Sequence, residues 1–174
     1  MTTTPLRTTS QAALRIDVTD RALPVSEMTD WVTLPDCGAV VTFTGTVREY
    51  SIPAGGPRVG QVTAIEYEAF ATHAVARMRE VAETALQRWP QTRRIALIHR
   101  TGLVPTGEAG VLVAVSAGHR VQAFLAAQFC IDVIKAAVPV WKLEHRHGHS
   151  ASWVETGTLI TDVTVAADRW EPYA

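Results

Sequence analysis

Residues 119–144, HRVQAFLAAQFCIDVIKAAVPVWKLE, contain a helix that is followed almost directly by a strand. The spacing of apolar residues predicts a helix from about His119 to Ala137. Pro139 cannot continue a helix and stops it. The segment from Val138 to Glu144 is rich in β-branched and aromatic residues, which predicts the next strand. One side of the helix carries the side chains of Phe124, Gln128, Ile131 and Lys135.

Strands and helices alternate along the rest of the chain. Alternating or densely β-branched segments predict strands at Leu14–Val18, Gly38–Val47, Val62–Ala69, Arg94–His99, Val111–Val115 and Thr158–Val165. Apolar residues at helical spacing predict helices at Ser26–Val32 and His73–Trp89. A stretch rich in Gly and Pro, Tyr50–Gly60, is expected to form a mobile loop. Helices that cover one face of a mixed sheet make an α+β sandwich, which is the fold class we expect.

The composition is that of an ordinary globular protein. A length of 174 residues suits one domain, which we place at residues 13–174 after a disordered tail at residues 1–12. The formal net charge of −1 argues against a general nucleic-acid-binding protein. No apolar run approaches the length of a membrane-spanning helix. Two cysteines, Cys37 and Cys130, do not make a disulfide framework, and we expect reduced thiols in the cytoplasm.

The first candidate site is the pair His119 and Arg120, which opens the helix. Positive side chains in a first helical turn oppose the helix dipole, at about 0.3–1 kcal/mol each. A bound anion would make this arrangement favourable, because the anion would meet the positive side chains and the free backbone N–H groups together. The alternative is that both side chains simply point into solvent.

The second candidate is the pair Lys135 and Lys142. Lys135 lies in the last helical turn, where it complements the dipole and could pair with Asp132. It also shares a side with Phe124 and Ile131, which suggests a partly buried amine whose pKa would be lowered. Lys142 lies in a strand, where lysine is unusual except at an edge. The spacing leaves open whether the two amines share a site.

Three further features are weaker. Arg48 ends a strand beside the Gly-rich loop, where an arginine could hold phosphate or carboxylate. The alternating His145, His147 and His149 could bind zinc or nickel if the strand continued, but no carboxylate or cysteine completes the set, and no metal site is assigned. Cys130 lies in the middle of a helix among apolar residues and is expected to be an inert core thiol.

Five stretches of the chain, in this order, resemble the catalytic, or large, subunit of molybdopterin synthase. They are GAVVTFTGTVRE (38–49), IEYEAF (65–70), IHRTGLVPTGE (98–108), VAVSAGHRVQAF (113–124) and IKAAVPVWKLE (134–144), followed by Trp153. The chain departs from the family where many members have an arginine shortly after the motif that matches residues 153–155. Thr156 and Gly157 follow that motif here.

The resemblance implies a fold and an activity. The fold would be an α/β hammerhead with two main helices and an extra antiparallel sheet. The enzyme would be a sulfurtransferase without a cofactor. It would move sulfur from the C-terminal thiocarboxylate of a small ubiquitin-like subunit to cyclic pyranopterin monophosphate, forming the dithiolene of molybdopterin. The subunit would be a homodimer within a heterotetramer, with no nucleic acid or membrane as partner.

The resemblance also implies roles for individual residues. By position, Lys135 and Lys142 match the two essential lysines of the family. Anion-binding residues are matched by Arg48, His119 and Arg120, and pocket-lining residues by Phe43 and Ile131. Because sulfur donor and substrate are both anions, fixed positive groups would reduce their repulsion.

Helix length limits how these residues can combine. At 1.5 Å per residue, His119 and Lys135 lie about 24 Å apart along one helix. One small pocket in one chain cannot easily use both residues, so a shared site would take His119 and Arg120 from a second subunit. The alternatives are a persulfide sulfurtransferase using Cys37 or Cys130, a metal-binding protein using the histidine run, and a non-catalytic module that binds a ubiquitin-like or pterin ligand.

Overall fold

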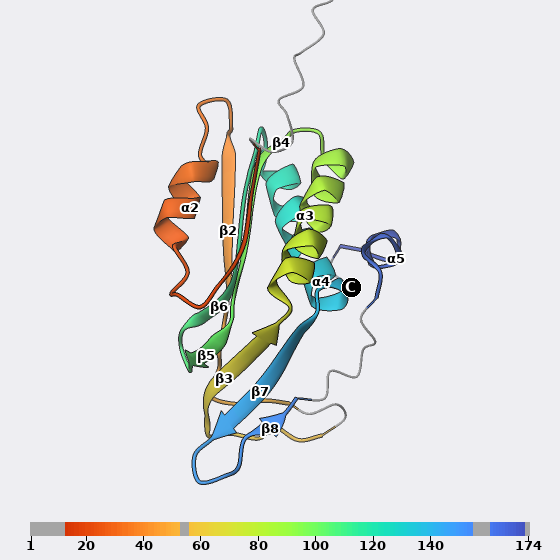
Figure 1. The fold of residues 1–174 in the computed structure, drawn as a ribbon. Coiled ribbons are helices and arrows are strands. Elements are labelled where there is room, and N and C mark those ends of the chain that lie inside the picture. The colour runs from red at the N-terminus through yellow and green to blue at the C-terminus, as the bar shows by residue number, and fades with distance from the viewer. Residues whose placement is uncertain (1–12, 53–55, 155–160, 173–174) are drawn as a thin grey trace, which may run out of the picture.

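A four-stranded sheet forms the centre of the molecule, in the order β1-β4-β6-β2 (Figure 1). The computed structural model describes residues 13–52, 56–154 and 161–172. The strands of this first sheet are β1 (Leu14–Thr19), β2 (Ala39–Thr46), β4 (Thr92–Arg100) and β6 (Ala109–Ala117). The pair β1–β4 is parallel, whereas β6 runs antiparallel to both of its neighbours. The sheet is therefore mixed, as expected.

Helices cover both faces of this sheet (Figure 1). Two long helices, α3 (Ala71–Arg88) and α4 (Arg120–Ala137), lie on one face, and the short α2 (Val25–Val32) lies on the other. The two main helices lie on one face of the mixed sheet, as expected, and the short α2 covers the other face as well. The reason is visible in β6, where Val113 and Val115 face the large core and Leu112 faces the core beneath α2. A strand buried on both faces is apolar at every position rather than at every second one.

A second four-stranded sheet extends from one end of the first, in the order β5-β3-β7-β8. Its strands are β5 (Gly102–Pro105), β3 (Val62–Ala69), β7 (Val140–Arg146) and β8 (Ser152–Trp153). All of its pairings are antiparallel. The strands β5 and β8 are absent from the sequence prediction, because elements of four and two residues are too short to show a period.

The C-terminal region contains a helix, α5 (Val163–Asp168), where the sequence predicts a strand over Thr158–Val165. The strand prediction is wrong for residues 163–165, and residues 155–160 lie outside the described part of the chain. The Asp162 side chain accepts a hydrogen bond from the Thr164 backbone N–H at 2.9 Å and caps the helix. Val163 and Ala167, four residues apart, are both buried, as helical spacing requires.

The other expected elements are confirmed with shifts of a few residues at their ends. The expected disordered tail, residues 1–12, lies outside the described residues, and a single domain over 13–174 stays a prediction. Among the described residues, no helix combines the length and the apolar character needed to span a membrane.

Candidate active site

A cavity of about 530 Å³ lies where the C-terminal end of α4 meets the second sheet and the end of β2. Its walls include Phe43, Arg48, Tyr50, Ser51, Tyr67, His99, Ile131, Lys135, Trp141, Lys142 and Glu144. Five of the seven residues that the resemblance selects therefore line one cavity. They come from three separate stretches of the chain, which the fold brings together.

The two lysines differ in their surroundings. Lys142, on β7 directly opposite Tyr67 of β3, is half-buried. Its pKa is lowered from the usual lysine value, first by burial and then by the positive charges of Lys135 and Arg48. Lys135 is exposed, so the expectation of a partly buried amine is wrong for that residue.

The proposed partner of Lys135 is also engaged elsewhere. The Asp132 carboxylate accepts a hydrogen bond from the Trp170 indole N–H at 3.0 Å. Among the described residues no carboxylate pairs with Lys135, which is exposed at the mouth of the cavity, whereas the half-buried Lys142 lies deeper. Two amines at different depths can meet two parts of one bound molecule.

Arg48 follows β2 and borders the same cavity. Its Nε donates to the Tyr50 carbonyl at 3.1 Å, and its guanidinium carbon lies 4.8 Å from the centre of the Tyr50 ring. These contacts fix the base of an otherwise exposed side chain. Within the described ranges the other guanidinium N–H groups have no hydrogen-bond partner, so they can bind an anion.

Phe43 and Ile131 form an apolar part of the cavity wall. Ile131 retains only 7% of its exposure, and Phe43 packs against the same core. The two side chains come from β2 and α4, and both line the cavity. An apolar wall beside cations suits a flat heterocyclic ring that carries a charged substituent.

The sequence patterns do not single out His99 and Tyr67, which also line the cavity. The His99 Nδ1 lies 2.8 Å from the Arg100 carbonyl, which can only accept, so Nδ1 carries the proton and Nε2 is an acceptor. Burial lowers the pKa of His99 to about 4, so the ring is neutral at pH 7. The Tyr67 ring packs edge-on against it at 5.2 Å, and burial raises the pKa of Tyr67.

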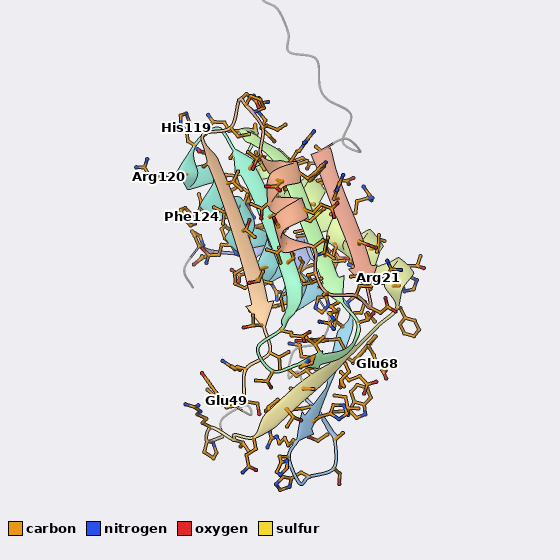
Figure 2. The ribbon with its side chains drawn as sticks, turned by 90° about the vertical axis from the view of Figure 1, so that its left-hand side faces the viewer. Arg21, Glu49, Glu68, His119, Arg120 and Phe124 are labelled. Atoms are coloured by element: carbon orange, nitrogen blue, oxygen red, sulfur yellow. The ribbon has the colours of Figure 1, made fainter. Side chains whose placement is uncertain are left out.

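His119 and Arg120 lie at the other end of α4 and do not line this cavity. His119 is the N-cap residue, no acidic residue occupies the first turn, and both side chains are exposed. Figure 2 shows them at the end of β2 that is farthest from Glu49, the neighbour of Arg48. The structure thus separates within one chain two groups that the resemblance assigns to one site.

The histidine run and Cys130 do not form a reactive or metal-binding site in the described parts of the chain. Strand β7 ends at Arg146, so the alternation does not continue to His147 and His149, and the His145 Nε2 lies 3.1 Å from the Glu66 carboxylate. No group of three or more metal-ligating side chains occurs in the described parts of the chain. Cys130 is fully buried, and burial raises the pKa of its thiol.

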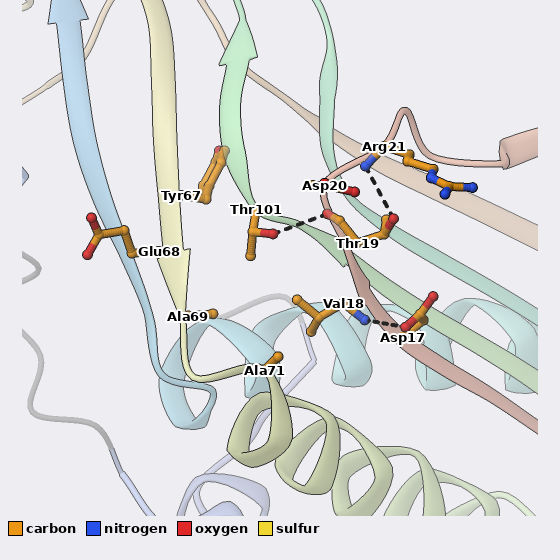
Figure 3. Close-up of a pocket in the computed structure, with 10 residues that line it drawn as sticks. All are labelled: Asp17, Val18, Thr19, Asp20, Arg21, Tyr67, Glu68, Ala69, Ala71 and Thr101. Atoms are coloured by element: carbon orange, nitrogen blue, oxygen red, sulfur yellow. Dashed lines mark hydrogen bonds between the residues drawn. The ribbon is translucent and has the colours of Figure 1, made fainter.

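A second hollow, of about 800 Å³, lies between the end of β1 and the start of α3 (Figure 3). Its polar groups are occupied locally. The Val18 N–H donates to the Asp17 carboxylate at 2.8 Å, and the Thr101 hydroxyl donates to the Thr19 carbonyl at 3.4 Å. It lacks the concentration of cations found in the first cavity.

A two-sheet α+β fold with a cationic, partly apolar cavity at the junction of its sheets defines the class of site: a pocket whose lining suits an anionic ring compound. The model of the family described as MoaE protein matches residues 18–137. The chain belongs to this family.

Curated relatives share the match over most of the chain. The molybdopterin synthase catalytic subunit of Taeniopygia guttata is 38% identical over 129 residues, which is 74% of this chain and 79% of that protein. The catalytic subunit of Homo sapiens is 37% identical over 138 residues, or 79% of this chain and 69% of that protein. The Staphylococcus aureus molybdopterin synthase crystal structure is 29% identical with a TM-score of 0.71, covering 79% of this chain and 95% of that one.

These similarities confirm the predicted family and fold. They also confirm the predicted enzyme class, because the curated relatives are catalytic subunits of molybdopterin synthase, a sulfurtransferase of molybdenum cofactor biosynthesis.

Proposed function

We propose that the cavity at the junction of α4 and the second sheet is the sulfur-transfer site of this chain. The substrate is cyclic pyranopterin monophosphate, and the sulfur donor is the C-terminal thiocarboxylate of a small ubiquitin-like subunit. The observation that carries the proposal is the gathering of Lys135, Lys142 and Arg48 around one cavity with an apolar wall. Two anions react there, and fixed cations lower their repulsion and stabilise the charged transition state.

The different depths of the lysines suggest different tasks. Lys135, at the mouth, meets the C-terminal carbonyl of the incoming tail and stabilises the oxyanion as sulfur leaves. Lys142, whose pKa is lowered by burial and by neighbouring cations, moves protons near the pterin. Arg48 binds phosphate, and Phe43 and Ile131 pack against the pterin ring. The tail enters as an extended segment held by main-chain hydrogen bonds.

A homodimer would bring His119 and Arg120 to this site. Strand β2 is an edge of the first sheet and runs from the His119 end of the molecule to the Arg48 end. A two-fold axis across this edge exchanges its ends, so His119 and Arg120 of one copy approach Arg48 of the other. Exposed apolar side chains on the same stretch of α4, Val121 at 55% and Phe124 at 57%, support an interface there.

Mixed dimers test this arrangement. Neither Lys135→Ala nor Arg120→Ala chains should be active alone. In a mixed dimer one site has lost both residues and the other has both intact. With random assembly of equal amounts, about a quarter of the parental activity should return. If mixing restores nothing while mixed dimers form, the two residues serve sites within one chain and the cross-subunit arrangement is wrong.

Reconstitution tests the function directly. The chain is mixed with thiocarboxylated small subunit and cyclic pyranopterin monophosphate, and the dithiolene product is sought by mass spectrometry. A small subunit that ends in an ordinary carboxylate is the matched control, because it binds alike and carries no sulfur. Product formation by the Lys135→Ala and Lys142→Ala chains at the parental rate would support a non-catalytic binding module instead.

The cysteine-based alternative has less support from the geometry. A persulfide carrier needs an accessible thiolate, whereas Cys130 is fully buried. The chain with both Cys37 and Cys130 replaced by Ser should keep its activity.

We also propose a cytoplasmic location, supported by two free cysteines, Cys37 and Cys130. Cell fractionation tests it.

A further inference from the structure

A buried ion pair lies at the edge of the proposed site, outside the residues that the proposed chemistry uses. The Glu144 carboxylate is 3% exposed and contacts the Arg146 guanidinium, whose side chain is 21% exposed. Both residues also bind Ser51. The Ser51 hydroxyl donates to Glu144 Oε1 at 3.2 Å and accepts from Arg146 Nη2 at 2.8 Å.

This cluster joins two separate parts of the cavity wall. Ser51 lies between β2 and β3 in the sequence, and its hydroxyl bonds tie it to Glu144 and Arg146 of β7. Its backbone pairs with Val59 through two hydrogen bonds of 2.9 Å, which closes the base of that segment. Tyr50, next to Ser51, holds Arg48 through its carbonyl and its ring. The position of Arg48 at the cavity thus depends on an anchor supplied by β7.

The same cluster controls a charge next to Lys142. Alternate residues of a strand point to the same face, so Lys142, Glu144 and Arg146 lie in a row on β7 with the carboxylate in the middle. A carboxylate beside an ammonium group favours the charged form of the amine. Arg146 is bound to this carboxylate instead. The charged or titratable groups that line the cavity around Lys142 are Lys135, Arg48, His99, Tyr50, Tyr67 and Glu144.

We propose that Arg146 is a positioning residue of the sulfur-transfer site: it holds Glu144 away from Lys142 and fixes Ser51, and with it Arg48, at the cavity. The inference rests on the proposed function for its kinetic consequences only. A purely structural pair would close the end of β7 without affecting Lys142 or the binding of phosphate. The two positioning roles of Arg146 are separable, because its effect on Lys142 acts through the charge of Glu144 and its effect on Arg48 acts through the anchoring of Ser51.

Three variants separate them. Arg146→Ala removes both roles and leaves a free carboxylate beside Lys142. The double variant, Arg146→Ala with Glu144→Gln, no longer has the free carboxylate beside Lys142, but it still lacks the anchor. Arg146→Lys keeps a positive charge for Glu144 and loses the planar fork that reaches both Glu144 and Ser51. Circular dichroism and thermal melting establish that each variant is folded. If Arg146→Ala does not fold, Arg146→Lys takes its place in the test of the anchor.

Two measurements need no catalytic activity. The first is the titration of Lys142, followed by NMR of isotopically labelled lysine side chains and assigned with Lys142→Arg. We expect the midpoint to rise by about one pH unit in Arg146→Ala and to return in the double variant. The second is amide exchange at Ser51 and Val59, which should speed up about tenfold or more in both variants.

The kinetic measurement is the split between KM and kcat for the pterin. KM should rise about tenfold in Arg146→Ala, in the double variant and in Arg146→Lys, because all three lose the anchor of Arg48. The pH profile of kcat should shift only in Arg146→Ala. Unchanged Lys142 titration and unchanged exchange in folded Arg146→Ala overturn the inference, even if the chain is an active synthase. If the two physical shifts occur but no variant or parent forms product, the proposed function fails and the positioning role stands.

Discussion

The two ends of α4 both carry positive side chains, but only one of them lies in a cavity of its own chain. At the C-terminal end, Lys135 stands beside Lys142 and Arg48 on the wall of a 530 Å³ cavity. At the N-terminal end, His119 and Arg120 are exposed. Dipole arguments treat the two ends as opposites, because a cation is stabilised at the C-terminus and destabilised at the N-terminus.

The difference shows what a helix dipole can and cannot indicate. Lys135 agrees with the dipole, and its position alone fits an ordinary surface residue. His119 and Arg120 oppose the dipole with no acidic residue in the first turn to compensate. The unfavourable end is the one that stands to gain from a bound anion. If the dimer is correct, each site combines one end from each copy.

The largest effect is expected from Lys142. We expect Lys142→Ala to lower kcat about a hundred- to a thousand-fold, because it removes a charge that is worth most in a partly buried site. Lys142→Arg is the matched control, since it keeps the charge but cannot release a proton. Single-turnover product formation measures both. Equal loss in both variants indicates proton transfer, whereas an active Arg variant would limit Lys142 to electrostatics.

The next effect tests the other end of the helix. Phe124→Asp should convert the dimer to a folded monomer and lower activity at least about tenfold, because it places a charge in the proposed interface. Val165→Asp is the control: Val165 is also apolar and exposed, at 39%, but lies on α5. Sedimentation and turnover are measured together. An active monomer would mean that Lys135 and Arg48 suffice without the second copy.

Much of this comparison can be predicted from the sequence, because it depends on local pattern. The helix, its stop at Pro139 and the strand that follows are short-range features, and the structure has them at Arg120–Ala137 and Val140–Arg146. The meeting of Lys135, Lys142 and Arg48 required the resemblance, since no spacing relates Arg48 to the other two. The separation of His119 from Lys135 followed from helix rise alone.

Other features depend on contacts between distant parts of the chain, which no local pattern reveals. Which lysine would be the more buried one could not be read from the helix, because Lys142 lies outside it, on β7 opposite Tyr67 of β3. The sequence places His99 near a strand end but does not reveal that the Tyr67 ring packs against it. The bond from Ser51 to Glu144 joins residues 93 positions apart. The strand predicted at 163–165 is wrong because one capping side chain outweighs the β-branched composition.

His99, which lines the cavity from β4, should make the protein sensitive to acid. Its folded pKa of about 4 lies below the usual 6.5, so between these values the unfolded chain binds a proton that the folded chain does not. Stability therefore falls as pH drops from 6.5 to 4, by up to about 3 kcal/mol. His99→Gln should flatten this slope in urea titrations followed by tryptophan fluorescence. A slope equal to the parental one would mean that the His99 ring is protonated within the folded site.

The smallest effect concerns how firmly the cavity end of the helix is held. The Trp170 indole N–H donates to the Asp132 carboxylate, and its ring packs edge-on against Phe129 at 5.4 Å and Trp89 at 5.6 Å. Trp170→Phe removes the donor and keeps an aromatic ring, so we expect a loss of about 1 kcal/mol in the free energy of unfolding. Turnover should change less than twofold, because Asp132 does not line the cavity and binds Trp170, which follows α5. A large fall in kcat with little loss of stability would mean instead that freed Asp132 turns to Lys135, and that the pairing expected from their spacing is suppressed in the native protein only by Trp170.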